Sequence, residues 1–422
     1  MRRGEYVDYT TILAPRRMVV TSRASLSSGL ALAAIAFATV FAAAPMAPAQ
    51  TRPADLHALP PVPTDYTPPK TPWGDYDFSH IYTLDNVADA KILFQRPREY
   101  GTRVWVTDAE FARRLKAAEA SDSHVGVRGV SATGTKGLAD WMRRSSFAWR
   151  TSLLVDPADG RLPPLTPKGQ KLFETGRSSW VPGQAFDWVT DFDTWDRCIT
   201  RGFPASMFPN RYNNGIRIFQ SPGYIVIEAE MLATRIIPIG DAPAWPKTVE
   251  GWMGDSRAHW EGKTLVIVTT NIQSGDSVSH DSAKRSAAPV IVTMIGGAPL
   301  DTTPMSPEAR TVERLTMTGP NTLMHELTYS DPETYTAPWT ARTEWTRDDG
   351  YKFYEYACHE GDVQIRNYIK ASRAERAAVA RGEKPAADNL KRFTGDFDHD
   401  PGVGAAAAGA GRAANSAAAA AG

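Results

Sequence analysis

Glu313 and His325 are the two residues of this sequence whose types and spacing best suit acid–base chemistry. They fall in neighbouring segments where apolar and polar residues alternate, which predicts the two strands of a β-hairpin. Matching the apolar faces puts Leu315 opposite His325, and it puts Met317 opposite Leu323. Glu313 then lies diagonal to His325, within reach of a long side chain. A carboxylate beside an imidazole raises the imidazole pKa and fixes its tautomer, as general acid–base catalysis requires.

The same pattern also describes a structural ion pair, because structural pairs perturb titration as catalytic pairs do. We expect this satisfied buried pair first, with a three-residue loop at 319–321 closing the hairpin. The catalytic alternative is a cofactor-independent hydrolase, lyase or isomerase in which Arg314 or His359 assists Glu313 and His325. The sequence leaves open whether the protein is an enzyme.

A second group of candidate site residues is aromatic and consists of Trp252, Trp260, Tyr335 and Trp339. Aromatic side chains with a polar end line pockets for apolar or sugar ligands. They are also common in the cores of sheets, and we expect that role more often. These aromatic residues lie close together in the sequence, whereas no motif with the spacing of a catalytic site is found. Binding of an apolar or aromatic small molecule is therefore the best functional hypothesis.

The sequence lacks the motifs that announce metal, nucleotide or serine-hydrolase sites. It contains no His-x-His and no His-Glu-x-x-His. It also contains no Gly-x-Ser-x-Gly, no Gly-x-Gly-x-x-Gly and no phosphate loop. We therefore predict neither a bound metal nor a cofactor.

Residues 254–271 predict the hairpin at the centre of the fold. Its second strand is apolar on both faces, with Leu265 on one side and Val266 on the other, as in a strand covered twice. Glu261 and Gly262 are expected to form the turn, since glycine tolerates the positive φ of tight hairpins.

Short alternating strands recur between residues 211 and 358, with a last strand at 351–358, and they predict a mainly β fold. We expect an antiparallel barrel (lipocalin-like) or a two-sheet sandwich, with an irregular α+β amino-terminal part packed on it. Thr107 and Glu110 have the spacing of a capping box, which predicts a short helix there. Residues 373–384 predict a surface helix.

Composition divides the chain into six regions. They are a signal peptide at 1–49, a proline-rich linker at 50–80, an α+β region at 81–194, an antiparallel β domain at 195–370, a carboxyl-terminal helix and loop at 371–400, and a disordered Ala/Gly tail at 401–422.

The leader decides the expected compartment. An apolar run at 29–44, with arginines before it and small residues after it, predicts a secretory signal cut between Ala49 and Gln50. The run is too short for a permanent span, so we expect a periplasmic or secreted protein without a membrane span after cleavage. Arg16 and Arg17 keep the twin-arginine export route open beside the general one.

The charge balance argues against nucleic acid as a partner. Lys plus Arg and Asp plus Glu number 47 each, so the net charge is +0 and no overall field attracts polyanions. A small-molecule ligand fits this composition, whereas protein partners cannot be inferred from it.

The two cysteines, Cys198 and Cys358, are expected to form a disulfide, since an exported chain with two cysteines is exposed to oxidation. The alternative is a free thiol, including a nucleophilic Cys358 beside His359. That arrangement fails if the segment is a strand, because neighbouring side chains then point to opposite faces.

Six stretches together resemble an uncharacterised family of exported bacterial proteins over residues 150–361. They include the motifs VDPxDGRxPPLTP, GDSRxxWEGxTLV, DPxTYTxPWT and EYACHEG, together with residues 196–198 and 212–223. The resemblance implies an exported β-rich protein with Cys198 and Cys358 matched to each other, and it implies no reaction. Similar sequences tend to carry a His and an acid where this chain has residues 232–234, Leu-Ala-Thr, so no site is expected at that place.

Overall fold

The computed structural model describes residues 52–84, 94–114, 116, 149–175, 185–192, 194, 196–209, 213–273 and 305–384. All of them belong to one compact unit, Ala47–Gly422. The signal peptide at 1–49, its cleavage site at Ala49 and Gln50, and the tail at 401–422 lie outside the described residues.

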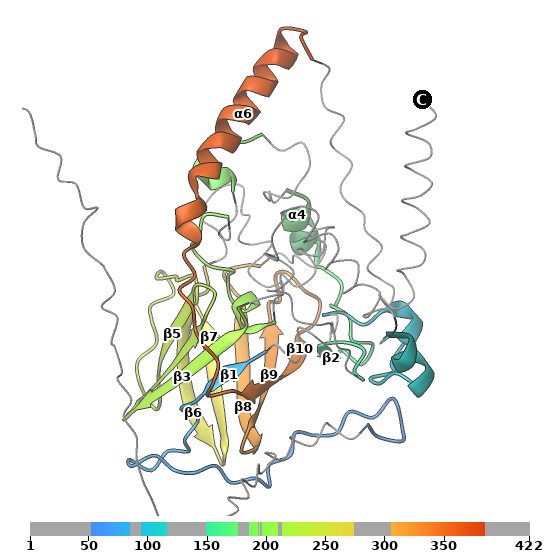
Figure 1. Ribbon diagram of the computed structural model, residues 1–422, viewed down its shortest axis with the longest axis vertical. Coiled ribbons are helices and arrows are strands. Elements are labelled where there is room, and N and C mark those ends of the chain that lie inside the picture. Colours follow the sequence, from blue (N-terminus) through green and yellow to red (C-terminus); the bar gives the residue numbers. More distant parts are fainter. Residues whose placement is uncertain are drawn as a thin grey trace, which may run out of the picture. The chain divides into compact units, whose positions relative to one another are not determined.

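Ten strands form one antiparallel sheet, which confirms the mainly β prediction (Figure 1). They are β1 (Ile81–Thr83), β2 (Leu154–Asp156), β3 (Gly215–Ser221), β4 (Tyr224–Ala229), β5 (Ala233–Pro238), β6 (Asp255–Glu261), β7 (Thr264–Thr270), β8 (Arg310–Gly319), β9 (Thr322–Ser330) and β10 (Trp339–Arg347). Their order is β5-β4-β3-β1-β10-β9-β8-β7-β6, and β2 pairs with β10 beside this path.

The two end strands of the sheet, β5 and β6, meet and nearly close a barrel. Just past β5, the backbone N–H of Gly240 donates to the carbonyl of Ala258 in β6 at 2.8 Å. Closure of this kind removes most of the unpaired edge that an open sheet exposes. Of the two expected architectures, the barrel is therefore the one that forms.

The helical elements are short except for one. They are η1 (Arg98–Tyr100), α4 (Pro167–Thr175), η2 (Val189–Asp191), η3 (Ala205–Met207), η5 (Cys358–Gly361) and α6 (Val363–Ala380), with further helical residues at 108–114. The capping box is confirmed, because the Thr107 N–H donates to the Glu110 carboxylate at 2.7 Å and the Glu110 N–H donates to Thr107 Oγ1 at 3.2 Å.

The β8–β9 hairpin has the predicted register, with Leu315 opposite His325 and Met317 opposite Leu323. Its loop differs from the prediction, because Gly319 pairs with Thr322 and the register shifts between Met317 and Gly319. The turn is therefore one residue shorter than the expected loop at 319–321, and the extra residue forms a bulge in β8. A bulge increases the local twist and lets a tight turn join the strands.

The β6–β7 hairpin also forms, with Leu265 fully buried and Val266 3% exposed, as expected for a strand covered on both faces. Gly262 has the expected positive φ of 62°. The predicted turn is displaced by one residue, since Glu261 still pairs with Thr264. Glu261 ends β6, and residues 262 and 263 make the turn.

The predicted strand at 351–358 is wrong, because residues 351–357 form no strand and Cys358 begins η5. The Glu230 carboxylate accepts hydrogen bonds from the Tyr351 hydroxyl at 2.6 Å and from the Tyr354 N–H at 3.2 Å. A side chain thus binds this segment where a neighbouring strand was expected. The alternation of apolar and polar residues does not distinguish an extended segment bound by a side chain from one paired with a neighbouring strand.

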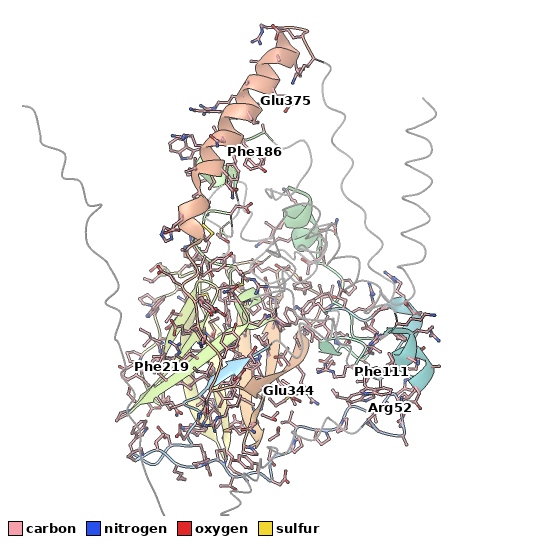
Figure 2. The ribbon with its side chains drawn as sticks, in the orientation of Figure 1. Arg52, Phe111, Phe186, Phe219, Glu344 and Glu375 are labelled. Carbon is pink, nitrogen blue, oxygen red and sulfur yellow. A yellow bond between two sulfur atoms is a disulfide. The ribbon has the colours of Figure 1, made fainter. Side chains whose placement is uncertain are left out.

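The predicted helix at 373–384 forms but with different bounds, since α6 begins at Val363 and ends at Ala380. It packs against residues 185–192, where Phe186 lies beside the helix with its ring 6.3 Å from that of Tyr368 (Figure 2). The Phe186 N–H donates to the hydroxyl of Ser372 at 3.0 Å. Among the described helices, none is both long and apolar enough to cross a membrane.

The sheet extends beyond the range 195–370 in which we expected it. Strand β1 lies between β3 and β10, and β2 pairs with β10, so the amino-terminal region contributes two strands. Residues from the expected linker at 50–80 also bind the folded part. Arg342 donates to the carbonyl of Pro60 at 2.7 Å, and Arg52 lies over the Trp149 ring beside Phe111 (Figure 2).

The predicted disulfide between Cys198 and Cys358 is confirmed, with an S–S distance of 2.11 Å across a sequence separation of 160. It joins the segment at 196–201 to the start of η5 and so fixes the approach to α6. The free-thiol alternatives are excluded, because neither cysteine is free.

Candidate functional site

The predicted Glu313–His325 pair forms inside the barrel and gains a third member, Arg235 of β5. Glu313 Oε1 lies 3.0 Å from His325 Nε2. Arg235 donates to both carboxylate oxygens of Glu313, at 3.0 Å and 2.5 Å. The other ring nitrogen of His325 lies 3.2 Å from the hydroxyl of Thr343. Glu313 and His325 are both 0% exposed, and Arg235 is 3% exposed.

The charge of this group follows from its contacts. Burial acts to raise the pKa of Glu313, but the Arg235 charge and the hydrogen bond to His325 outweigh it and lower the pKa to about 2. Glu313 is therefore ionised at neutral pH, and both of its oxygens are occupied by Arg235. A carboxylate held this way is a weak proton acceptor, so the geometry is that of a stable buried ion pair.

The two proposed helpers do not join this pair. Arg314 follows Glu313 in β8 and therefore points to the opposite face, where it contacts Glu261 at 2.9 Å. His359 is exposed and lies in η5, next to the disulfide. The catalytic arrangement of Glu313 and His325 with Arg314 or His359 is thus not assembled.

The four aromatic candidates form separate groups instead of one cluster. Trp339 stacks on Tyr329 with ring centroids 4.9 Å apart, and Tyr335 meets the edge of Tyr329 at 6.0 Å. Trp260 instead packs against Phe78 at 5.3 Å. Trp252 is half-buried, in the loop before β6. Sequence proximity was misleading, because Trp260 and Trp339 occupy different levels of the barrel.

The site that the barrel does assemble is a row of polar residues at one level of its interior, which we call the polar row. Its members are direct cross-strand neighbours on five consecutive strands and are at most 6% exposed. They are Ser256 of β6, Thr269 of β7, Thr311 of β8, Tyr329 of β9 and Trp339 of β10. Trp260 lies four residues along β6 from this row, about 13 Å away.

Part of the polar row is hydrogen-bonded. The hydroxyls of Ser256 and Thr269 lie 2.9 Å apart, and Arg235 donates to them at 3.1 Å and 3.0 Å. The Tyr329 hydroxyl donates to Asp331 at 3.2 Å. Burial, and then the Asp331 carboxylate, raise the pKa of Tyr329, so this hydroxyl remains a donor. Arg235 thus connects the polar row to Glu313 one level away.

Three donors at this level have no hydrogen-bond partner within the described part of the chain. They are the Thr311 hydroxyl, the Trp339 indole N–H and the Nε–H of Arg235. Leaving a buried donor unpaired costs about 1–3 kcal/mol. The site therefore has a deficit of acceptors.

Apolar residues from two loops cover the polar row. The Arg235 guanidinium lies over the ring of Phe203 at 4.4 Å, and the sulfur of Met207 is 3.5 Å from Arg235 Nη1. Phe94 meets the edge of Trp339 at 5.5 Å and that of Phe208 at 5.6 Å. The site thus combines unpaired donors with an aromatic cover. We call Phe94, Phe203 and Phe208 the aromatic cover.

The described residues contain one group that matches metal-ligand geometry, formed by Cys198, Cys358 and Asp362. Its two sulfurs are bonded to each other in the disulfide, so they offer no thiolate. Asp362 Oδ1 lies 3.2 Å from Cys198 Sγ. This group does not resemble a working metal centre.

Sequence reasoning missed Arg235 and four of the five members of the polar row. Each is an ordinary inward residue of its own strand, so no local spacing identifies it. Only the register of five strands brings them together. In comparisons with known proteins, no family model, no curated protein and no solved structure matches the chain.

Proposed function

We propose that this is an exported binding protein that holds an apolar or aromatic small molecule at the polar row. The apolar body of the ligand packs against the aromatic cover, and an oxygen acceptor on the ligand receives hydrogen bonds from Thr311 and Trp339. The export signal read from the leader and the disulfide support a place outside the cytoplasm.

The observation that carries the proposal is the set of three unpaired buried donors at one level of the barrel. Donors outnumber acceptors there, so a ligand with a carbonyl or carboxylate oxygen recovers free energy that a hydrocarbon does not. Small-molecule sites have this composition, with mainly apolar walls and a few polar groups that fix orientation.

Thermal-shift and native mass spectrometry measurements test the proposal with matched ligand pairs, such as an aromatic ketone and the corresponding alkylbenzene. We expect the ketone to raise the unfolding temperature and the alkylbenzene to do so much less. Thr311→Val removes one donor at nearly constant volume, and Trp339→Phe removes one donor together with part of the ring volume, so each should weaken ketone binding about tenfold.

Trp345→Phe is the matched control, because Trp345 lies on the same face of β10 and is also 0% exposed. It is six residues from the polar row and should leave ketone binding unchanged. Equal affinity for both members of the ligand pairs, or equal effects of all three variants, would overturn the proposal. Failure of every ligand in the series would also count against it.

A second candidate function is the cofactor-independent hydrolase, lyase or isomerase, and the contact of 3.0 Å between Glu313 and His325 favours it. It requires Glu313 to accept a proton, although Arg235 holds both of its oxygens. An activity panel at several pH values tests this candidate. Turnover that survives His325→Gln would exclude a role for the pair.

A further inference from the structure

Four of the buried arginines lie around the segment that leads into β2, outside the polar row, and take no part in the proposed function. Arg96, Arg114, Arg150 and Arg342 are 1%, 5%, 8% and 9% exposed, respectively. Arg150 immediately precedes the segment that enters β2, and Arg342 belongs to β10, which pairs with β2. Fully buried arginine is rare in proteins unless it is paired with an opposite charge.

Arg96 and Arg150 donate mainly to uncharged oxygens. Arg150 donates to the carbonyl of Arg342 at 2.9 Å and to that of Ser152 at 2.9 Å. Arg96 donates to the carbonyl of Ala158 at 2.6 Å and to the hydroxyl of Thr151 at 3.0 Å. Carbonyl oxygens satisfy N–H groups but do not neutralise a buried charge.

Among these four arginines, Arg342 contacts a carboxylate and Arg114 lies near one. Glu326 contacts Arg342 at 2.7 Å. Arg114 donates to the carbonyl of Arg150 at 3.0 Å and lies near Glu110, which is itself paired with Arg103 at 2.8 Å. Among the described residues, neither Arg96 nor Arg150 contacts a carboxylate. Asp159 acts on Arg96 only through its charge, as Glu344 and Glu326 act on Arg150.

The pKa shifts of these arginines follow from burial and, for Arg150, from neighbouring positive charge. Burial, together with the charges of Arg342 and Arg96, lowers the pKa of Arg150 to about 9 against the opposing charges of Glu344 and Glu326. Burial also lowers the pKa of Arg96, against the opposing charge of Asp159. Glu344 of β10, labelled in Figure 2, has its own pKa raised by burial, so it is a weak counter-charge.

Two guanidinium N–H groups of this cluster have no acceptor in the part of the chain that is described. They are Nη2 of Arg96 and Nε of Arg150, and both atoms are buried. The two guanidinium groups bind adjacent residues of one segment, since Arg96 Nε donates to the Thr151 hydroxyl at 3.0 Å and Arg150 Nη2 donates to the Ser152 carbonyl at 2.9 Å. Planar guanidinium groups that present free N–H donors are the preferred protein partners of oxyanions.

We propose that Arg96 and Arg150 form a second binding site, which takes an oxyanion such as phosphate, sulfate or a ligand carboxylate. The anion accepts hydrogen bonds from Arg96 Nη2 and Arg150 Nε and neutralises the buried charge between them. This site is independent of the polar row. It would give the protein an anionic ligand in addition to the apolar or aromatic molecule proposed for the polar row.

The test is thermal unfolding of the full chain with added inorganic phosphate, sulfate or acetate, against chloride at matched ionic strength. We expect a saturable rise in the unfolding temperature at millimolar phosphate, as required when a ligand binds the native state alone. Acetate distinguishes a planar carboxylate from a tetrahedral oxyanion, and binding of either supports the site. Isothermal titration calorimetry with phosphate gives the stoichiometry, expected to be one per chain.

Arg96→Lys keeps the charge but removes Nη2, so it should raise the half-saturating phosphate concentration about tenfold or more. Arg217→Lys is the control, because Arg217 lies on the half-exposed face of β3 beside Glu228. If Arg96→Lys does not fold, Arg150→Lys replaces it and the wild-type titration still decides. No saturable effect on the wild type would overturn the proposal. An equal effect on the wild type, Arg96→Lys and the control would mean an adventitious ion only, and would overturn it as well.

Discussion

Replacing Glu313 by Gln removes the negative charge that Arg235 and His325 share in the barrel. The folded pKa of Glu313 is about 2, below its ordinary value of 4.5. This difference corresponds to about 3 kcal/mol of stability at neutral pH. The variant also leaves the Arg235 guanidinium buried without its partner, which costs about 3–5 kcal/mol in comparable cases. We therefore expect Glu313→Gln to lower the free energy of unfolding by about 3–5 kcal/mol.

The pH dependence gives a sharper signature. Because the folded pKa is depressed, the stabilisation is complete above about pH 4.5 and is lost as the pH falls towards 2. Between pH 5 and pH 3 the wild type should lose about 2 kcal/mol through this group alone. Glu313→Gln should lack that component. Urea unfolding followed by tryptophan fluorescence at several pH values measures both effects.

Glu261→Gln is the matched control, since Glu261 is exposed and pairs with Arg314 at the surface. It should leave stability nearly unchanged. The double variant Arg235→Leu with Glu313→Leu should cost less than Glu313→Gln, because it leaves no unpaired charge. The reasoning is refuted if Glu313→Gln has the wild-type midpoint and the wild-type pH profile.

Two further predictions concern the disulfide and two glycines. Replacing both Cys198 and Cys358 by Ser should lower the free energy of unfolding by up to about 5 kcal/mol, since the bridge closes a separation of 160 residues; an unchanged urea midpoint contradicts this. Gly160→Ala should destabilise more than Gly101→Ala in thermal unfolding. Both glycines have positive φ, but a Cβ at 160 meets Arg96 at 2.8 Å, whereas one at 101 meets nothing within 4 Å. Equal effects would exclude the clash.

The buried group around Glu313 illustrates a limit on acid–base function. Apolar surroundings raise the pKa of an isolated carboxylate and prepare it for catalysis. Arg235 reverses that effect, since its guanidinium contacts both oxygens of Glu313. A binding role at the polar row does not require Glu313 to titrate, so the two features can coexist in one barrel.

Local pattern predicted several features because the forces behind them act between near neighbours. The register of β8 and β9 followed from the alternation of Leu315 and Met317, since a slip of one residue exposes every apolar side chain. The capping box of Thr107 and Glu110 followed from a spacing of three residues. The wrong prediction of a strand at 351–358 shows where local pattern stops being informative. This segment is bound by the side chain of Glu230, the residue after β4, and no local pattern encodes that contact.

The amino-acid sequence by itself determined the mainly β class, the Glu313–His325 neighbourhood and the pairing of the two cysteines. Each of these depends on residue type together with a short-range period or a count. Only the tertiary structure decided that Arg235 reaches Glu313, because 78 residues separate them and barrel closure brings β5 to β6. The polar row was likewise decided by the register of five strands. The buried arginines were decided by the packing of the segments around residues 96 and 150 against each other and against β10, because these contacts join parts of the chain that are far apart in the sequence.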